Sequence, residues 1–370
     1  MPPDRFAEAR WFGAKGQRVG HLELDEAFEL DETAGSLLAV VRVVGEGGAD
    51  LGRYSLPITL TPDGPREAVE GDGAWRALAT TMAEGRTIPA LPEPRPAGGS
   101  PGPFSAALVC RPAGGLPGLV PGGPSAVGAL AERSLGVDQS NTSVVLGERL
   151  VLKAFRRLEP GLNPDLELTA YLSEEAGFEA VPRLAGFAEI VSARHDMATV
   201  AMLQEYVLDA EDGYESTAER LVDWLLAPGE VALEFATAEA ASLGRLTAGL
   251  HATLAAARAP GFEPREATRA ELRAWREAAE RQLATALAVV PPEVRDELSV
   301  LAPANGNELS VFEALPAPPL LTRVHADYHL GQVLRTPDGF VIIDFEGEPT
   351  RAIEERRRHN SPLHDVASFL

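Results

Sequence analysis

The stretch VHADYHLGQVLRTPDGFVIIDFEGEPTR, Val324 to Arg351, contains two acidic clusters joined by a turn. Asp327 stands between two histidines near its start, and Asp344 and Glu346 follow the apolar run FVII. The intervening TPDG (336–339) is typical of a turn, because proline presets one backbone dihedral angle and glycine supplies a positive one. We expect a hairpin that brings the two clusters side by side at one edge of a small sheet.

Such a hairpin has the groups that phosphoryl transfer with Mg²⁺ requires, a proton acceptor beside a pair of oxygen ligands. We expect Asp327 to orient or deprotonate an acceptor hydroxyl. Asp344 would bridge Mg²⁺ to the phosphates, with Gln332 as the second oxygen ligand. Glu346 would either bind the metal directly or hydrogen-bond the groups that bind it. The hairpin therefore predicts an ATP-dependent kinase.

The H-x-D-x-H spacing also admits a zinc site built from His325 and His329. No cysteine and no third histidine clusters nearby in the sequence, which disfavours zinc. The favoured role of His325 is structural, bracing the loop through hydrogen bonds.

A lone lysine, Lys153, ends the apolar strand pattern RLVLK, and a helix begins shortly afterwards at Pro164-Asp165. In kinases the strand lysine contacts the α and β phosphates of ATP and is held by a helix carboxylate, for which Glu167 is the natural candidate. Taken singly, these residues read as an exposed strand lysine and a first-turn acid. Their order with Asp327 and Asp344 favours the functional interpretation.

Two further segments are candidates for nucleotide contacts. A polar turn stands where a phosphate-binding loop would lie, and small polar residues can cradle phosphate, although an ordinary polar turn explains them equally well. At the end of a predicted strand, backbone groups of Glu205 and Val207 would face adenine, or the segment is a plain strand end before an acidic loop. The candidate residues of the polar turn are Ser140, Asn141, Thr142 and Ser143.

Composition limits the class of protein. The chain has 370 residues, 45% of them hydrophobic, so two or three domains with a sizeable core are expected. A net charge of −22 argues against nucleic acid or an anionic membrane as the main partner, since both depend on basic patches. The single cysteine, Cys110, fits a reducing cytosol and a place in the core. Because no signal pattern and no long apolar run appear, we expect a cytoplasmic protein.

Segment patterns predict the organisation. Residues 1–90 alternate short apolar runs with turns and read as β-rich, and residues 92–124 are loaded with proline and glycine and read as a linker. Two strands, 142–146 and 150–155, form a predicted hairpin, and 200–207 is a further strand. Residues 216–288 have helical periodicity, broken at Pro228-Gly229 and Pro260-Gly261.

HADYH followed by IDFE resembles the aminoglycoside phosphotransferase-like kinases, relatives of the eukaryotic protein kinases. Further motifs, spread over nearly the whole chain, resemble bacterial maltokinases: RWFGAKG (10–16), QSNTS (139–143), FRRLEPG (155–161), HLGQ (329–332) and DFEGEP (344–349). The resemblance implies an α+β, bilobal protein-kinase-like fold. Its parts would be an N-terminal cap domain (1–90), a kinase N-lobe including the linker (91–207) and a helical C-lobe (208–370).

By the same resemblance the enzyme would transfer the γ-phosphate of Mg-ATP to the anomeric hydroxyl of maltose. Actinobacterial glucosamine kinases resemble the chain in the same motifs, so glucosamine or another small sugar is the alternative acceptor. A catalytically impaired, pseudokinase-like binding protein is the alternative from another class, because the family continues with more helices beyond Leu370 and the C-lobe is expected to be truncated. Ala326 stands where the superfamily has glycine, a mild change if its φ is negative.

Three more residues receive expectations from their surroundings. Trp11 and Phe12 are predicted core residues of the first domain, and Lys15 is a hypothetical contact to the polar turn. His251, within a helical stretch, is predicted to be a buried histidine with a satisfied hydrogen bond.

Overall fold

The computed structural model describes residues 3–92, 106–135, 141–226, 230–291, 294, 315 and 317–370. The chain forms two compact units. The first comprises Met1–Leu246, His325–Arg357 and Ser368–Leu370, and the second comprises Thr247–Val324 and Arg358–Ala367. The predicted catalytic hairpin therefore belongs to the same unit as the N-terminal half of the chain.

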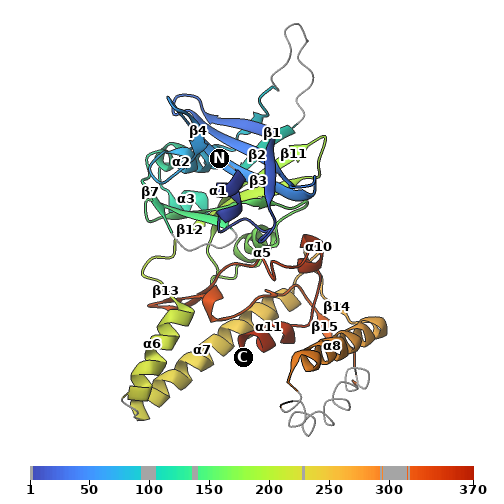
Figure 1. Ribbon diagram of the computed structural model, residues 1–370. Helices are drawn as coiled ribbons and strands as arrows, with labels where there is room; N and C mark the ends of the chain where they lie inside the picture. The colour runs from blue at the N-terminus through green and yellow to red at the C-terminus, as the bar shows by residue number, and fades with distance from the viewer. Residues whose placement is uncertain are drawn as a thin grey trace. The chain divides into compact units, whose positions relative to one another are not determined.

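An antiparallel sheet built mainly from the N-terminal residues opens the first unit (Figure 1). Its strand order is β1-β2-β3-β10, with β4 also paired to β3. Phe12 and Tyr54 are fully buried in its core, and Trp11 packs against Tyr54 with ring centroids 5.8 Å apart, which confirms the predicted core role of Trp11 and Phe12. The elements are α1 (Pro3–Glu8), β1 (Val19–Asp31), β2 (Ser36–Gly45), β3 (Asp50–Thr61), β4 (Gly64–Glu67) and β10 (Arg157–Leu158).

A second, seven-stranded antiparallel sheet has the order β5-β6-β11-β12-β9-β8-β7. Central strands β9 and β12 are almost wholly buried, and their side chains share one core with residues of β1, β2 and α2. Its strands are β5 (Thr87–Pro89), β6 (Ala106–Pro112), β7 (Glu132–Ser134), β8 (Asn141–Leu146), β9 (Leu150–Phe155), β11 (Leu184–Ser192) and β12 (Ala198–Glu205). Two short helices, α3 (Leu116–Leu119) and α4 (Pro124–Val127), follow β6.

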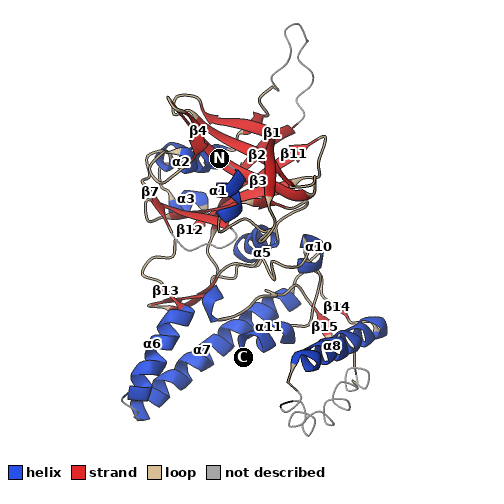
Figure 2. Cartoon of the chain, viewed as in Figure 1, coloured by secondary structure: helices blue, strands red, loops and turns tan. Residues whose placement is uncertain are grey.

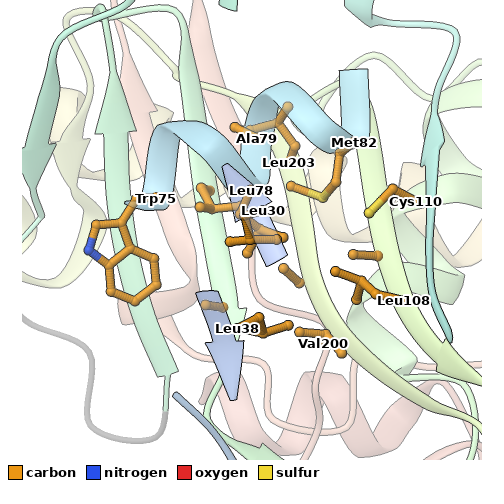
Figure 3. Close-up of a cluster of buried hydrophobic side chains, with 14 of the residues drawn as sticks. Leu30, Leu38, Trp75, Leu78, Ala79, Met82, Leu108, Cys110, Val200 and Leu203 are labelled. Carbon is orange, nitrogen blue, oxygen red and sulfur yellow. The ribbon is translucent and has the colours of Figure 1, made fainter. Parts of the chain in front are cut away.

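Helix α2 (Ala74–Glu84) supplies much of the core between the elements of this unit. Its buried side chains, Leu78 and Met82 among them, pack with Leu108 of β6 and Leu203 of β12 (Figure 3). Each such fully buried apolar side chain contributes roughly 1.5–3 kcal/mol to stability. The core thus joins the N-terminal residues to the sheet that carries the predicted strand lysine.

Cys110 lies in the same core, as expected, and is 2% exposed. Burial raises the pKa of its thiol to about 12, although the positive charge of Arg86 opposes the shift. The thiol is therefore protonated and inert at neutral pH in the folded protein.

The structure differs from the predicted linker in its second half. Ala106–Pro112 is strand β6, which pairs with both β5 and β11 inside the seven-stranded sheet. The apolar run AALVC was hidden by the proline- and glycine-rich residues on both sides, and sheet pairing together with core burial overrides that composition. The first half, 93–105, lies outside the described residues.

Both predicted hairpins are confirmed. β8 and β9 pair from Asn141↔Phe155 to Leu146↔Leu150, joined by a turn in which Gly147 and Glu148 have positive φ. The second hairpin, β16 (Val333–Thr336) and β17 (Gly339–Ile342), closes at Thr336↔Gly339 with Gly339 at φ 146°. A two-residue strand, β13 (Glu211–Asp212), completes this three-stranded sheet.

The helix predicted after Lys153 is α5 (Pro164–Ala170), continued by η1 (Tyr171–Glu175). Its N-cap is Asn163, whose side chain accepts the backbone N–H of Asp165 at 2.8 Å, and Pro164 occupies the first turn. Short elements η3 (Leu330–Gln332) and α10 (Ile353–Arg356) flank the second hairpin in the chain.

Downstream of β13 the described chain is mainly helical, as predicted (Figure 2). The elements are α6 (Gly213–Leu226), α7 (Glu230–Ala255), β14 (Arg265–Glu266), α8 (Arg269–Val289), β15 (Leu320–Leu321) and α11 (Leu363–Phe369). The expected break at Pro260-Gly261 falls between α7 and α8, whereas Pro228-Gly229 lies outside the described residues. Among the described helices, none is both long and apolar enough to cross a membrane.

The second unit contains His251 and the start of helix α8. His251 is a satisfied, mostly buried histidine, as predicted, with its Nε2 atom 3.0 Å from Oδ2 of the fully buried Asp365. Helix α8 begins with a capping box in which Thr268 and Glu271 bond each other's backbone N–H groups.

Candidate active site

The ammonium group of Lys153 lies among three carboxylates. Its Nζ atom is 2.8 Å from Oδ2 of Asp165, 2.6 Å from Oδ1 of Asp344 and 2.7 Å from Oε1 of Glu346. The side chain of Lys153 is 8% exposed, so its charge is held by these partners rather than by water. Both acids of the predicted cluster that follows the FVII run, Asp344 and Glu346, are thus joined to the predicted strand lysine.

Local structure explains how distant residues converge here. Lys153 lies on β9, which pairs with β8 and β12 at the centre of the seven-stranded sheet. Asp165 lies in the first turn of α5 and is 2% exposed. Its second oxygen, Oδ1, accepts the backbone N–H of Phe345 at 2.9 Å, so one carboxylate ties α5 both to the strand lysine and to the segment DFE.

The helix carboxylate bound to Lys153 is therefore Asp165, whereas the sequence pointed to Glu167. Glu167 instead forms a bidentate salt bridge with Arg357. The Nε atom of Arg357 is 2.9 Å from Oε2 of Glu167, and its Nη2 atom is 2.7 Å from Oε1. The two acids are two positions apart on one helix and so leave it in different directions. Asp165 is the functional candidate that the sequence analysis missed, and its place after the N-cap asparagine is the signal that could have found it.

Electrostatics differ between the two acids of the DFE segment. Burial opposes ionisation of Asp344, but the adjacent Lys153 ammonium holds the pKa of this carboxyl below its ordinary value. Burial raises the pKa of Glu346 to about 7, because the charges of Asp344 and Asp165 add to the effect of desolvation and exceed the pull of Lys153. The group thus contains more negative than positive charge.

These residues fit Mg²⁺. Ligand oxygens of Asp165, Asp344 and Glu346 lie within 4.8 Å of one another, and among the described residues no other set of at least three histidine, cysteine or acidic side chains forms such a group. The side chain of Gln332 hydrogen-bonds Asp344 and would supply an amide oxygen. Hard oxygen ligands with excess negative charge suit Mg²⁺ and offer nothing that selects a softer metal.

The two histidines of HADYH serve the backbone. His325 is fully buried, its Nε2 is 3.0 Å from the carbonyl oxygen of Ile343, and its ring packs 4.8 Å from that of Phe345. His329 accepts the N–H of Gly331 through Nδ1 at 3.1 Å and so caps η3. The structure supports the predicted bracing role of His325 and gives no support to the zinc alternative.

Asp327 lies between these braced residues and next to Tyr328, which is fully buried. It is partly buried, and its carboxylate has no hydrogen bond or ion pair to any part of the chain that the structure describes. A carboxylate held on a fixed loop without an internal partner is available to a ligand hydroxyl.

The polar turn is described from Asn141 onward, and Ser140 lies outside the described residues. Asn141 is 6% exposed and its side-chain amide donates to Glu346, which connects the start of β8 to the carboxylate group. Thr142 and Ser143 are strand residues of β8, paired with Ala154 and Lys153. Their role in phosphate binding stays a prediction.

At the end of β12, one of the backbone groups expected to contact adenine already has a partner within the chain. The backbone N–H of Glu205 donates to the carbonyl of Arg183 at 2.9 Å, which leaves the carbonyl oxygen of Glu205 and the backbone of Val207 as candidates. The Glu205 carboxylate accepts two hydrogen bonds from the guanidinium of Arg183, which lowers its pKa.

The ammonium group of Lys15 donates a hydrogen bond to the carbonyl oxygen of Ala9 at 2.6 Å. This contact does not support the contact between Lys15 and the polar turn that the sequence suggested.

Two residues near the site have left-handed backbone conformations. Asp344 has φ 63° and Ala326 has φ 69°. The substitution of alanine for glycine at 326 is therefore strained, contrary to the mild change expected for a negative φ. Strain of this kind persists where the surrounding contacts enforce it, and it clusters at functional sites.

We expect Ala326→Gly to stabilise the protein by about 0.5–1 kcal/mol, because relief of the left-handed strain exceeds the added flexibility of the unfolded chain. Urea unfolding measures the change. Ala170→Gly, at φ −60° in helix α5, is the matched control and should destabilise by about 1 kcal/mol. Equal destabilisation by both substitutions would contradict the strain at 326.

Matched substitutions of Asp165 and Glu167 test which of the two helix acids supports Lys153. Asp165→Asn should lower kcat by about 10-fold or more, because the charge beside Lys153 is lost and the single amide oxygen cannot accept from both Lys153 and the N–H of Phe345. Glu167→Gln, the same change two residues along, should leave the Lys153 group intact and alter kcat far less. Steady-state rates of ADP release for the two variants decide between them, and a larger loss in Glu167→Gln would restore the prediction from sequence.

Comparisons with known proteins agree with this geometry. Residues 132–370 match the phosphotransferase enzyme family (APH), and residues 6–88 match the maltokinase N-terminal cap domain. A glucosamine kinase of Streptacidiphilus jiangxiensis is 31% identical over 355 residues, 95% of this chain and 71% of that protein. A glucosamine kinase of Mycolicibacterium smegmatis is 32% identical over 243 residues, 65% of this chain and 58% of that protein.

Among solved structures, a glucosamine kinase in complex with glucosamine, ADP and inorganic phosphate has a TM-score of 0.70 at 27% identity. That alignment covers 100% of this chain and 78% of the other. A second crystal form of glucosamine kinase gives a TM-score of 0.71 at 28% identity, with the same coverage.

Fold and site together define an ATP-dependent kinase of the phosphotransferase class. The chain belongs to the APH phosphotransferase family and includes a maltokinase-type N-terminal cap domain. The expected α+β, kinase-like fold with a cap domain is confirmed.

Proposed function

We propose that this kinase phosphorylates a hydroxyl group of glucosamine. The observation that carries the proposal is the similarity to glucosamine kinases over 95% of the chain in sequence and 100% in structure. A structure of one relative contains glucosamine and ADP together. A cytoplasmic location is part of this proposal, because the enzyme would consume ATP that is made there.

Each residue of the site receives a role from its contacts. Asp327, with no partner in the described chain, accepts a hydrogen bond from the acceptor hydroxyl and orients it for attack. Lys153 contacts the phosphates of ATP, as its ammonium is already positioned on β9 by Asp165.

Asp344 and Gln332, supported by Glu346, would hold Mg²⁺. When bound, the ion neutralises charge that develops on the transferred phosphoryl group. The same carboxylates hold the Lys153 ammonium in place in the absence of nucleotide. The polar residues Asn141, Thr142 and Ser143, together with Ser140, would line the phosphate side of the nucleotide, and the backbone of Glu205 and Val207 its adenine side.

Maltose is the second candidate acceptor, favoured by the match of residues 6–88 to the maltokinase cap domain. Its target would be the anomeric hydroxyl, which is more acidic than an ordinary alcohol, so Asp327 would contribute more by positioning than by strong base catalysis. The product would be maltose 1-phosphate.

A coupled ADP-release assay on the purified chain with glucosamine, maltose, glucose and an aminoglycoside tests both candidates. We expect the largest kcat/KM for glucosamine, and identification of the phosphorylated product by mass spectrometry excludes simple ATP hydrolysis. A larger kcat/KM for maltose would replace the first candidate by the second. Activity on neither sugar would overturn the proposal.

A further inference from the structure

Two motifs that the proposed reaction does not use meet at Arg157. This residue belongs to FRRLEPG (155–161) and pairs through β10 with Tyr54 of β3. The motif RWFGAKG (10–16) contributes Gly13, whose N–H donates to the Tyr54 hydroxyl at 3.2 Å. A Cβ atom built on Gly13 would lie 3.4 Å from Nη1 of Arg157, and one on Gly52 would lie 3.8 Å from its Nε. The guanidinium therefore lies against glycine backbone at two places.

Arg157 and Gly52 line two neighbouring cavities. The larger has a volume of about 620 Å³ and is bounded by β10, the residues after it and the loop between β11 and β12. The smaller has a volume of about 400 Å³ and also includes Gly13 and Ala14. The larger cavity falls in the size range of sites for small metabolites.

The charge of Arg157 is not compensated. Its side chain is exposed and forms no hydrogen bond or ion pair with the described part of the chain. A second arginine of the larger cavity, Arg53, is by contrast bound to Asp25 at 2.8 Å and Glu26 at 2.9 Å. The acid nearest in sequence, Glu159, is an ion-pair partner of the buried Arg356.

The rest of the larger cavity is mixed but includes more basic groups. Arg194 donates to the carbonyl of Asp25 at 3.3 Å, and His195 is 3.5 Å from the Asp25 carboxylate. Besides Glu159, one acidic residue lines the cavity, the exposed Asp196. Since Arg53 is compensated by Asp25 and Glu26, the positive charge that this cavity offers to a ligand is mainly that of Arg157.

We propose that the larger cavity binds the phosphate group of a small phosphorylated metabolite, with Arg157 as its anchor. A guanidinium offers a planar fork of N–H donors that matches two phosphate oxygens, and an uncompensated arginine at the wall of a cavity favours such a ligand. The smaller cavity is the weaker candidate, because it offers Arg157 alone and sets Asp50 against it, whereas the larger cavity also includes Arg194 and His195.

Isothermal titration with inorganic phosphate, glucose 6-phosphate and citrate, in EDTA and without nucleotide, tests this site. We expect Arg157→Gln to weaken binding of the phosphate compounds by about 10-fold or more, the loss typical of a charged hydrogen-bonded partner. Arg157→Lys keeps the charge without the fork and should lose less. The matched control is Arg18→Gln, an exposed arginine of the same sheet region that is 3.7 Å from Glu46.

Two further comparisons make the test specific. Binding should persist in Asp344→Ala, which separates this cavity from the kinase site, and Arg157→Gln should retain its basal kcat. Tighter binding of glucose 6-phosphate than of phosphate supports a metabolite, and equal binding identifies free phosphate as the ligand. Absence of binding, equal binding by wild type and Arg157→Gln, or equal Arg157-dependent binding of citrate would overturn the proposal. None of these outcomes depends on which sugar is the acceptor.

Discussion

Asp327→Asn is expected to lower kcat by about 10²–10⁴-fold, the range typical for loss of a positioned acid–base group. Asparagine cannot accept a proton, which explains the expected loss of rate. Because it keeps the shape of the side chain, the loop held by His325 and Tyr328 should remain folded. Nucleotide binding should stay within about twofold of wild type, because the Lys153 group does not include Asp327. Rates come from an ADP-release assay and affinities from calorimetry.

Asp338→Asn is the matched control for this prediction. It makes the same chemical change on the same hairpin, at an exposed turn position between β16 and β17. We expect its kcat to equal that of wild type. Turnover of Asp327→Asn at a near-normal rate would remove Asp327 from the catalytic role.

Local chemistry explains what the sequence predicts well. The turn residues at 147–149 and 336–339 fix two hairpins by their own dihedral preferences, and both hairpins form with the expected strands. Lys153 lies on the first hairpin, and Gln332 and Asp344 flank the second, so the order of these residues along the chain translates directly into one site. Short-range rules sufficed because each hairpin needs only its own residues.

The choice between Asp165 and Glu167 is decided by tertiary structure instead. Both are first-turn acids of α5 and have the same propensity there. Rotation of the helix about its axis selects one, and that rotation depends on the backbone of Phe345, 180 residues further along the chain. The partner of Glu167, Arg357, lies in a run of three arginines that has no short-range signature of this pairing.

Burial of charge is the other property that residue patterns conceal. Arg156 is fully buried, ion-paired with Glu67 and with its guanidinium 4.4 Å from the ring centroid of Trp11. Its neighbour Arg157 is exposed. Arg156 lies in the bend between β9 and β10, whereas Arg157 begins β10 and pairs with Tyr54 of β3, so two adjacent, identical amino acids acquire opposite environments that only the tertiary structure decides.

Removal of the Asp344 carboxylate is expected to abolish Mg²⁺-dependent nucleotide binding. Loss of groups that merely support metal ligands costs about 10–100-fold in metal affinity, so loss of a direct ligand should exceed this. Asp344→Ala tests it by calorimetry with ATP, in Mg²⁺ and in EDTA. We expect the wild type to bind more tightly with Mg²⁺ and the variant to show no difference between the two conditions.

Asp344→Asn guards against a folding artefact, because asparagine tolerates the left-handed conformation at φ 63° better than alanine does. Lys153 keeps Asp165 and Glu346 as partners in both variants, so its ammonium stays buried with compensation. Both variants should therefore fold and both should lose the Mg²⁺ effect, whereas Asp338→Ala in the exposed turn should keep it. Unchanged Mg²⁺-dependent affinity in a folded Asp344→Asn would assign the metal to Asp165 and Glu346 without Asp344, and the roles proposed for the DFE segment would be wrong.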